Sequence, residues 1–150
     1  MIALACDHGG YDLMQKIKSY LDSSKISYKD FGTHNTDSCD YPVYAALAGR
    51  SVASGECNFG ILVCGTGIGM SIAANKISGI RAALCCNTYM AEMARNHNDA
   101  NVLVLGARVL DPTLALDIVK VFLIENFDGG GRHSVRVKML DKLDNLEGLH

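Results

Sequence analysis

The stretch Phe59–Lys76, FGILVCGTGIGMSIAANK, contains the three parts from which we predict the fold. An apolar run ends at Cys64, a glycine loop spans Gly65–Gly69, and the residues from Met70 onward favour a short helix. Glycine permits positive φ angles and lets a ligand approach the backbone closely. The first N–H groups of a helix are free and carry partial positive charge. This stretch therefore predicts an anion site with the thiol of Cys64 at its edge.

The spacing of the glycine loop differs from two common nucleotide-binding motifs. The third glycine of a Rossmann GxGxxG motif would come one position after Gly69, and Cys85 and Cys86 stand where that motif expects an acidic residue. A Walker loop requires a lysine, which this loop lacks. We therefore expect a smaller anion, or an oxyanion that forms during a reaction. A tight turn around a buried cysteine remains the alternative.

Short apolar runs alternate with helical patterns along the chain. We expect strands at residues 2–6, 27–31, 59–64, 80–86 and 102–105. We expect helices around residues 13–21, 41–55, 70–76, 88–97, 112–126 and 132–146. The alternation predicts an α/β fold with a single domain over residues 1–150. In this three-layer αβα domain, a five-stranded parallel sheet of Rossmann-like or flavodoxin-like order lies between helices, and a C-terminal helix follows.

The apolar residues of the helices predict which sides are buried. The second helix should turn inward Leu47, Ala48, Ser51 and Val52. The fourth should turn inward Met90, Met93, Ala94 and His97. The helix that begins at Asp111-Pro112 is apolar almost all round, so we expect burial on more than one side and a subunit interface. The last helix is amphipathic and aligns Val135, Met139, Leu143 and Leu146.

Composition and charge narrow the class of protein. The chain has 150 residues, a net charge of −2 and no apolar run near the roughly 18 residues of a membrane span. Its N-terminus lacks the basic and apolar regions of a signal peptide. We therefore expect a cytoplasmic protein that binds neither nucleic acid nor membrane. The six cysteines lack CxxC and zinc-site spacing, which indicates reduced thiols and no structural metal.

Polar side chains with chemical uses follow three of the predicted strands. Asp7 and His8 follow residues 2–6, Cys64 ends the strand at 59–64, and Arg108 comes soon after residues 102–105. Ligands of open α/β sheets bind at the carboxyl ends of the strands, so we expect these side chains to meet at one edge. Asp7 can orient a sugar hydroxyl or accept loop N–H groups. His8 can bind an anion or simply face water.

Two further sites allow either a functional or a structural interpretation. Arg132 and Arg136 are four residues apart, so they share a helical face that either binds a phosphate or is merely solvated. His97, followed by Asn98, ends a predicted helix. A histidine in that place can cap carbonyl groups or take part in chemistry.

Together these motifs make the chain resemble the type B ribose-5-phosphate isomerases, the family that also contains the galactose-6-phosphate isomerase subunits. The resemblance covers nearly the whole chain, in family order. Its segments are CDHGGY at 6–11, DFGTH at 30–34, DYP at 40–42, CGTGIGMSIAANK at 64–76, GIRAALC at 79–85, HNDANVL at 97–103, LGARV at 105–109 and GGRH at 130–133. The segment at 64–76 and HNDAN at 97–101 are highly specific.

The resemblance implies an aldose–ketose isomerase of the non-oxidative pentose phosphate pathway. Such an enzyme interconverts ribose 5-phosphate and ribulose 5-phosphate through an enediol(ate), without a metal or another cofactor. The resemblance also implies a Rossmann-like αβα fold and a homodimer with active sites shared between subunits. Some members of the family pair further into a dimer of dimers. The ligand would be a small phosphorylated sugar.

The resemblance implies a role for each matching residue. Cys64 corresponds to the base that moves a proton between C1 and C2, Thr66 to the hydroxyl that supports it, and His97 to the ring-opening residue. The N–H groups of the glycine loop would cradle the enediolate oxygen, and Asp7 would help to hold the sugar. The phosphate ligands would be His8, Arg132 and Arg136. The remaining substrate-binding positions are Tyr41, Gly65, Gly67, Ile68, Gly69, Ser71, Asn98 and Arg108.

Other functions stay open at this point. An isomerase of galactose 6-phosphate or allose 6-phosphate would share these motifs, although Cys64, Thr66 and His97 favour the ribose enzyme. A non-catalytic phosphosugar-binding domain would need neither Cys64 nor His97, and a thiol redox protein would need a CxxC motif. The chain departs from the family pattern in a third glycine at residues 129–131, just before the helix that carries Arg132.

Overall fold

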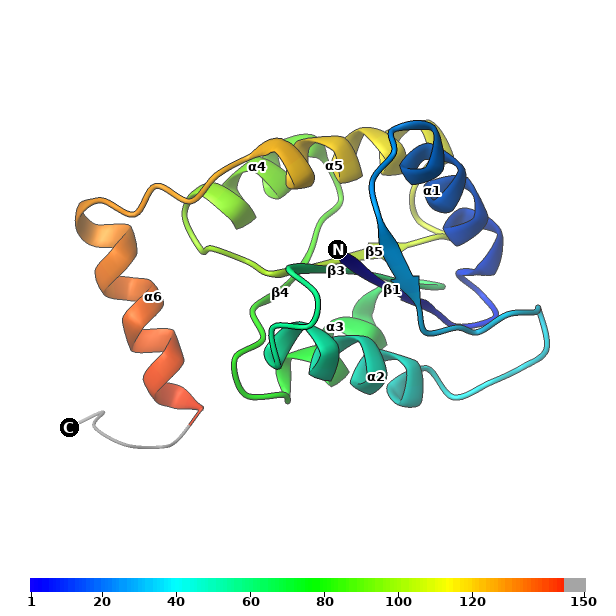
Figure 1. The fold of residues 1–150 in the computed structure, drawn as a ribbon, viewed down its shortest axis with the longest axis horizontal. Helices are drawn as coiled ribbons and strands as arrows, with labels where there is room; N and C mark the ends of the chain where they lie inside the picture. Colours follow the sequence, from blue (N-terminus) through cyan, green and yellow to red (C-terminus); the bar gives the residue numbers. More distant parts are fainter. Residues whose placement is uncertain (145–150) are drawn as a thin grey trace.

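The computed structural model describes residues 1–144, in which five parallel strands form one sheet (Figure 1). The strands are β1 (Ile2–Cys6), β2 (Tyr28–Asp30), β3 (Phe59–Cys64), β4 (Ala82–Leu84) and β5 (Val102–Gly106). The helices in this range are α1 (Tyr11–Ser23), α2 (Tyr41–Ala53), α3 (Ile68–Asn75), α4 (Thr88–Asn96), α5 (Pro112–Ile124) and α6 (Gly131–Leu143). None of the helices within residues 1–144 is long and apolar enough to cross a membrane.

Helices cover both faces of the sheet. One face carries α1, α4 and α5, and the other carries α2 and α3 (Figure 1). The strand order is β2-β1-β3-β5-β4, which begins like the flavodoxin-like order but places β5 between β3 and β4. The predicted three-layer α/β fold with a C-terminal helix is therefore confirmed, and β4 forms one edge of the sheet.

The centre of the sheet lies in β1, β3 and β5, whose residues are almost all buried. Successive residues of a strand face opposite layers. Ile61 and Leu103 belong to the core under α1, α4 and α5, whereas Leu62 and Val104 belong to the core under α2 and α3. This packing on both faces fixes the carboxyl ends of the three strands, where the predicted chemical residues follow.

Strand β4 is shorter than the strand predicted at residues 80–86. Only Ala82–Leu84 pair with β5. On the other side of β4, the side chain of Asn75 takes the place of a neighbouring strand: its Nδ2 donates to Ala82 O at 2.9 Å, and its Oδ1 accepts from Ala82 N at 2.8 Å. A side chain therefore satisfies the backbone groups of Ala82 on the edge of β4 that has no neighbouring strand in the described sheet.

The predicted inner faces of α2 and α4 are partly wrong. Leu47 on α2 is 44% exposed and Met90 on α4 is 40% exposed, although the apolar pattern placed both inward. The buried residues are mostly small: Ala45, Ala48, Gly49, Ser51 and Val52 on α2, and Ala91, Ala94 and Arg95 on α4. Helix α2 lies close to its neighbours, because a Cβ added to Gly49 would come within 2.6 Å of Cδ1 of Ile77. Larger apolar side chains therefore point away from the core.

Helices α5 and α6 also expose apolar side chains. On α5, Leu114 and Ile124 near the two ends are exposed, while the middle of the helix is buried. Among the described residues of α6 only Val137 is buried, and 45–59% of the surface is exposed for Val135, Met139 and Leu143. The fourth residue predicted on this stripe, Leu146, lies outside the described residues. Figure 1 shows α6 standing apart from both helix layers, beyond β4. The predicted subunit interface stays a prediction.

Candidate active site

Cys64 is the last residue of β3 and lies where the strand meets the glycine loop. Its side chain is buried, and Sγ accepts a hydrogen bond from Gly67 N at 3.1 Å. The loop is joined to the end of β5, because Ala107 N donates to Cys64 O at 2.9 Å and Arg108 N donates to Gly65 O at 2.8 Å. An N–H donor stabilises negative charge on its acceptor. The thiol is therefore placed where it can act as a base.

Two glycines of the loop lie against larger side chains of the predicted site. A Cβ added to Gly69 would lie 2.6 Å from Cζ of Tyr41. One added to Gly65 would lie 2.9 Å from Nη1 of Arg108. The absence of a side chain at both positions lets Tyr41 and Arg108 reach the loop backbone, next to Cys64.

Backbone groups hold the two predicted site residues that follow β1. Asp7 is buried; its N–H donates to Val63 O at 3.1 Å, and its Oδ1 accepts from Gly10 N at 3.0 Å. Nδ1 of His8 accepts from Cys39 N at 3.3 Å. This bond leaves the hydrogen of the neutral imidazole on Nε2, so neutral His8 can donate to an anion.

The first residues of α3 complete the loop. Thr66 is exposed, and its Oγ1 accepts from Ile68 N at 3.3 Å. Ser71 is half-buried, and its N–H donates to Gly67 O at 3.0 Å in the first turn of the helix. Two N–H groups predicted to cradle an oxyanion, those of Gly67 and Ile68, thus contact the side chains of Cys64 and Thr66. A substrate oxygen would compete with these side chains for the donors.

These residues form what we call the carboxyl-edge group: Asp7, His8, Tyr41, Cys64–Gly69, Ser71 and Arg108. A Cβ added to Gly9, which follows β1, would lie 3.1 Å from Nη2 of Arg108 and 3.3 Å from Gly65 N. The segments that follow β1, β3 and β5 therefore converge. The prediction that the chemical residues after these strands meet at one edge of the sheet is confirmed.

The other four predicted residues, His97, Asn98, Arg132 and Arg136, form what we call the helix-end group. They lie at the C-terminal end of α4 and on the first turns of α6. The ring of His97 stacks on that of His133, with centroids 4.1 Å apart and planes 8° apart. Partial burial, and then the neighbouring His97 and Arg132, lower the pKa of His133, which favours a neutral ring in this stack.

The structure does not bring the two groups together within one chain. Helix α4 begins beyond the carboxyl end of β4 and runs back along the sheet. Its end lies near the amino end of β4, where the side chain of Arg81 contacts Asp99, two residues after His97. Strands β3 and β5 separate β1 from β4, which places them about 14 Å apart at the usual strand spacing. Helix α6 lies still further out (Figure 1). His8 and the arginines of α6, all predicted phosphate ligands, are therefore far apart.

Two residues that contact the predicted site were not predicted. His133 belongs to the GGRH segment at 130–133, but its stacking on His97 depends on how the irregular residues 125–130 direct α6. Cys39 holds His8 through its backbone N–H, from the irregular segment between β2 and α2. A backbone contact of this kind leaves no side-chain pattern in the sequence.

Both groups are suited to anions. His8 and Arg108 supply N–H donors in the carboxyl-edge group, and Arg132 and Arg136 supply them in the helix-end group. In the part of the chain that the structure describes, no three His, Cys, Asp or Glu side chains are grouped so that they could hold a metal ion. The arrangement can transfer a proton at Cys64 beside a bound anion.

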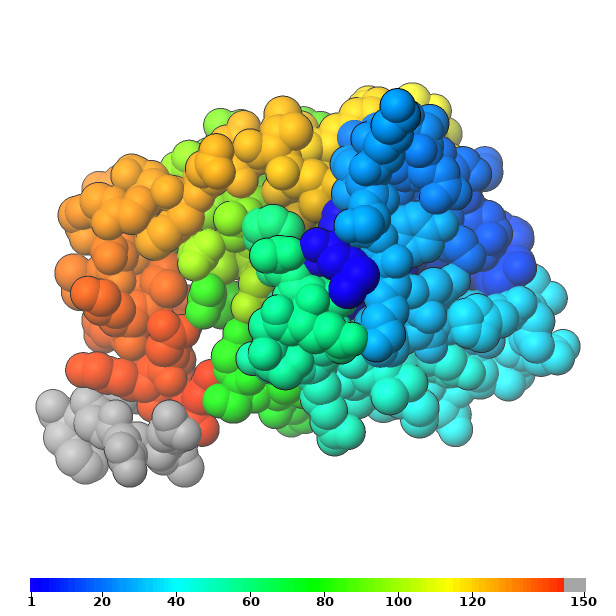
Figure 2. Space-filling view, in the orientation of Figure 1, coloured from blue at the N-terminus to red at the C-terminus, as the bar shows by residue number. Residues whose placement is uncertain are grey.

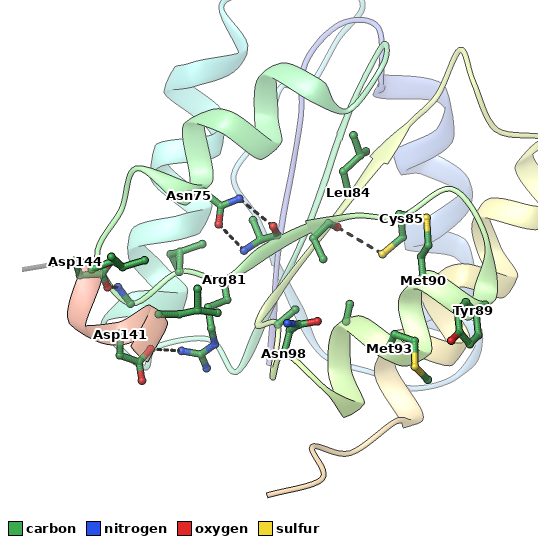
Figure 3. Close-up of a pocket in the computed structure, with 18 residues that line it drawn as sticks. Asn75, Arg81, Leu84, Cys85, Tyr89, Met90, Met93, Asn98, Asp141 and Asp144 are labelled. Carbon is green, nitrogen blue, oxygen red and sulfur yellow. Dashed lines mark hydrogen bonds and ion pairs between the residues drawn. The ribbon is translucent and has the colours of Figure 1, made fainter. Parts of the chain in front are cut away.

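An apolar groove of about 580 Å³ lies between β4, α4 and α6, beside the helix-end group (Figure 3). Figure 2 shows a gap there, between the orange-red atoms of α6 and the green atoms near β4. Asn98 lines the groove together with the apolar side chains of Leu84, Tyr89, Met90, Met93, Leu140 and Leu143. None of the described lining residues belongs to the carboxyl-edge group. The groove is therefore separate from the space around Cys64.

Comparison with known proteins identifies the family. A family model described as Ribose/Galactose Isomerase matches residues 2–140. The chain is 44% identical over 143 residues to ribose-5-phosphate isomerase B of Escherichia coli K12, covering 95% of each chain. It is 43% identical over 131 residues to D-erythrulose-4-phosphate isomerase of Pectobacterium atrosepticum, covering 87% of this chain and 86% of that one.

A solved structure supports the same conclusion. Ribose-5-phosphate isomerase B of Clostridium thermocellum is similar with a TM-score of 0.95 and 49% sequence identity, and the match covers 98% of this chain and 99% of that chain. The resemblance stated from the sequence motifs is confirmed by matches of this length and identity. The chain therefore belongs to the ribose/galactose isomerase family and is a sugar phosphate isomerase.

Proposed function

We propose that the protein interconverts ribose 5-phosphate and ribulose 5-phosphate through an enediolate, with Cys64 as the base, in the non-oxidative pentose phosphate pathway. The observation that carries this proposal is the position of Cys64 Sγ at the carboxyl edge, 3.1 Å from Gly67 N and beside the start of α3. Ligands of α/β sheets bind at that edge. The two relatives named ribose-5-phosphate isomerase B support a five-carbon substrate.

The proposed reaction moves one proton between neighbouring carbons. The thiolate of Cys64 takes the proton from C2 of the open-chain aldose, and negative charge develops on the oxygen at C1. The N–H groups of Gly67 and Ile68 are close enough to stabilise this charge. Losing one such donor typically raises the barrier by about 2.7–4 kcal/mol. Return of the proton to C1, with transfer of the hydroxyl proton from O2 to O1, gives the ketose and restores the thiolate.

The phosphate would bind away from the reacting carbons. His8 offers Nε2–H, Arg108 lies beside the loop, and Arg132 and Arg136 share a face of α6. Binding energy from the phosphate holds the sugar in place for proton transfer at C1 and C2. In this scheme His97 opens the sugar ring before the proton moves.

We infer that the working enzyme is a homodimer whose active sites each combine the carboxyl-edge group of one subunit with the helix-end group of the other. The separation of the two groups within one chain supports this inference. So does the apolar groove, which lies beside the helix-end group and next to edge strand β4. An exposed sheet edge and an apolar surface favour association with a second copy of the chain.

Proton NMR in D₂O with ribose 5-phosphate tests the reaction. We expect the wild type to form ribulose 5-phosphate with deuterium at the carbon that receives the proton. We expect Cys64→Ala to form no product. Cys64→Ser is a matched control of nearly equal size, which should stay folded but lose nearly all activity, because a hydroxyl is a far weaker acid than a thiol. Conversion by Cys64→Ala at the wild-type rate would exclude Cys64 as the base.

Phosphosugars with six or four carbons are the competing substrates. The family description includes galactose, and the relative from Pectobacterium atrosepticum is named for D-erythrulose 4-phosphate. We expect kcat/KM to be at least about tenfold higher for ribose 5-phosphate than for allose 6-phosphate, galactose 6-phosphate or erythrulose 4-phosphate, since a pocket shaped for one chain length discriminates by about this factor. A higher value for another sugar would change the substrate and keep the chemistry at Cys64.

A further inference from the structure

Helix α6 is joined to the rest of the domain mainly by polar contacts. Among its described residues only Val137 is buried, and the preceding residues 125–130 are irregular. The polar contacts to it include the stack of His133 on His97, the hydrogen bonds to Asp144 from Gly79 N and Ser78 Oγ, and the ion pair of Asp141 with Arg81. Arg81 also contacts the turn after α4, so its ion pair with Asp141 joins α6 to that turn.

Arg81 contacts α6 and the turn after α4 at the same time. Its Nη1 donates to Asp141 Oδ1 at 2.9 Å, as Figure 3 shows. Its Nη2 donates to Asp99 Oδ2 and its Nε to Asp99 O, both at 3.0 Å. The side chain is 20% exposed, and the backbone N–H donates to Asn101 Oδ1 at 2.8 Å. Because the guanidinium is planar with donors in fixed directions, it fixes Asp141 relative to Asp99.

Asp99 is in turn anchored in the core. Nη1 of the buried Arg95 donates to Asp99 Oδ1 at 2.9 Å and to Ala100 O at 2.8 Å. The Arg95 guanidinium lies 4.7 Å from the ring centroid of Phe59 on β3. Asp99 follows His97 by two residues. The turn that carries His97 is therefore fixed to the sheet on one side and joined to α6 by Arg81 on the other.

We propose that Arg81 is a positioning residue that sets where Arg132 and Arg136 lie relative to His97. This inference rests on the proposed function, in which those arginines bind the phosphate and His97 opens the ring. Asp141 lies five residues after Arg136 on the same helix. Without the Arg81–Asp141 contact α6 gains conformational freedom, which phosphate binding must then remove, so affinity falls.

The two sides of the Arg81 contact predict different kinetic effects. Asp141→Asn removes the ion pair between Arg81 and α6 and leaves the contacts of Arg81 to Asp99 in place. It should raise KM for ribose 5-phosphate and the Kd of inorganic phosphate about threefold, the size expected for one exposed ion pair, with kcat unchanged. Asp141→Glu keeps the charge and should restore most of the affinity. Arg81→Met also releases Asp99, so it should raise KM about tenfold and lower kcat as well.

Asp117→Asn is the matched control. Asp117 is a partly exposed aspartate on α5, paired with Lys120 at 3.0 Å, so its substitution also removes one ion pair. It should leave KM, kcat and phosphate affinity unchanged. All variants are compared at a concentration at which light scattering gives the wild-type mass, so that subunit association does not differ between them.

Calorimetric titration with inorganic phosphate separates this inference from the proposed function. If the wild type does not convert ribose 5-phosphate but Asp141→Asn binds phosphate more weakly than Asp117→Asn, the positioning role stands and the proposed substrate fails. Equal KM and equal phosphate affinity in Asp141→Asn and the wild type would overturn the inference. A lower Tm of Asp141→Asn without a change in KM or phosphate affinity would also overturn it, because the contact would then be purely structural.

Discussion

The cysteines of this chain differ strongly in environment. Burial raises the pKa of Cys6 to about 12, with smaller contributions from the carboxylates of Asp30 and Asp7. Burial likewise raises the pKa of Cys85 to about 12. Sγ of Cys64, in contrast, accepts an N–H from the glycine loop. The first two thiols are therefore inert parts of the core, whereas Cys64 combines a thiol with a backbone N–H donor at the carboxyl edge.

The raised pKa values of Cys6 and Cys85 predict how the free energy of unfolding depends on pH. The unfolded chain loses the protons of Cys6 and Cys85 near pH 9.0, whereas the folded protein loses them only near pH 12. Above pH 9 the folded state binds more protons, so rising pH favours unfolding. We expect the free energy of unfolding, measured with urea, to fall between pH 8 and 10. The free energy of unfolding should fall less steeply with pH in Cys85→Ala than in the wild type. Equal slopes in these two proteins would contradict the raised pKa of Cys85.

A pair of glycines tests the close packing of the loop. Gly67 and Gly55 have nearly the same positive φ, +79° and +81°, but only Gly67 is crowded. A Cβ added there would clash with Cδ1 of Leu84 and lie 3.0 Å from the carbonyl carbon of Leu105, whereas one added to Gly55 meets nothing within 4 Å. Gly55→Ala should cost about 1–2 kcal/mol for the backbone alone. Gly67→Ala should lower the free energy of unfolding, measured with urea, by about 1–3 kcal/mol more than Gly55→Ala does. Equal losses in the two variants would show that Gly67 is not crowded.

The elements that the sequence predicts best are those with local signals. Asp111 caps α5, as the Asp111-Pro112 start predicts, by accepting from Thr113 N at 2.8 Å, and Asn87 caps α4 by accepting from Met90 N at 2.8 Å. The length of β4 could not be predicted in this way, because it is set by pairing with β5, which lies about 20 residues later in the sequence. The inner face of α4 was predicted wrongly because the apolar pattern leaves out Arg95, a charged side chain that is buried against the rings of Phe59 and Phe122.

The cap of α5 gives a prediction for a single element. Asp111→Ala should lower the free energy of unfolding by about 1 kcal/mol, because Thr113 N loses its acceptor at the start of a helix that buries Phe122 and Ile118. Asp117→Ala on the same helix removes only a partly exposed ion pair and should cost less than about 0.5 kcal/mol. Thermal and urea unfolding of the two variants side by side measure the difference. A larger loss for Asp117→Ala would contradict the capping role.

In the whole molecule, the sequence motifs predict the kinds of residues in the site better than their arrangement. Cys64, His8 and Arg108 meet because they follow neighbouring strands. His97 and Arg132 do not join them, because α4 runs back to the other end of the sheet before α6 begins. Whether these two residues serve their own chain or a second copy is not encoded by any spacing in one sequence.

Mixed dimers test whether the active sites are shared. Cys64→Ala and His97→Ala should each be inactive alone. In a heterodimer with shared sites, one of the two sites contains both mutations and the other contains none. Random pairing of equal amounts should therefore restore about a quarter of the wild-type activity. If Cys64 and His97 act within the same subunit, co-expression of differently tagged variants will restore no activity.

The position of β5 between β3 and β4 has a consequence for synthesis on the ribosome. Strand β4 pairs with β5 alone in the described sheet, yet it emerges about 20 residues earlier. At the usual rate of about 5–20 residues per second, β4 waits about 1–4 s for its partner. During that time β3 exposes the edge that β5 will later occupy. A nascent chain of this protein therefore completes its sheet only after residues 102–106 leave the exit tunnel, however early its first three strands assemble.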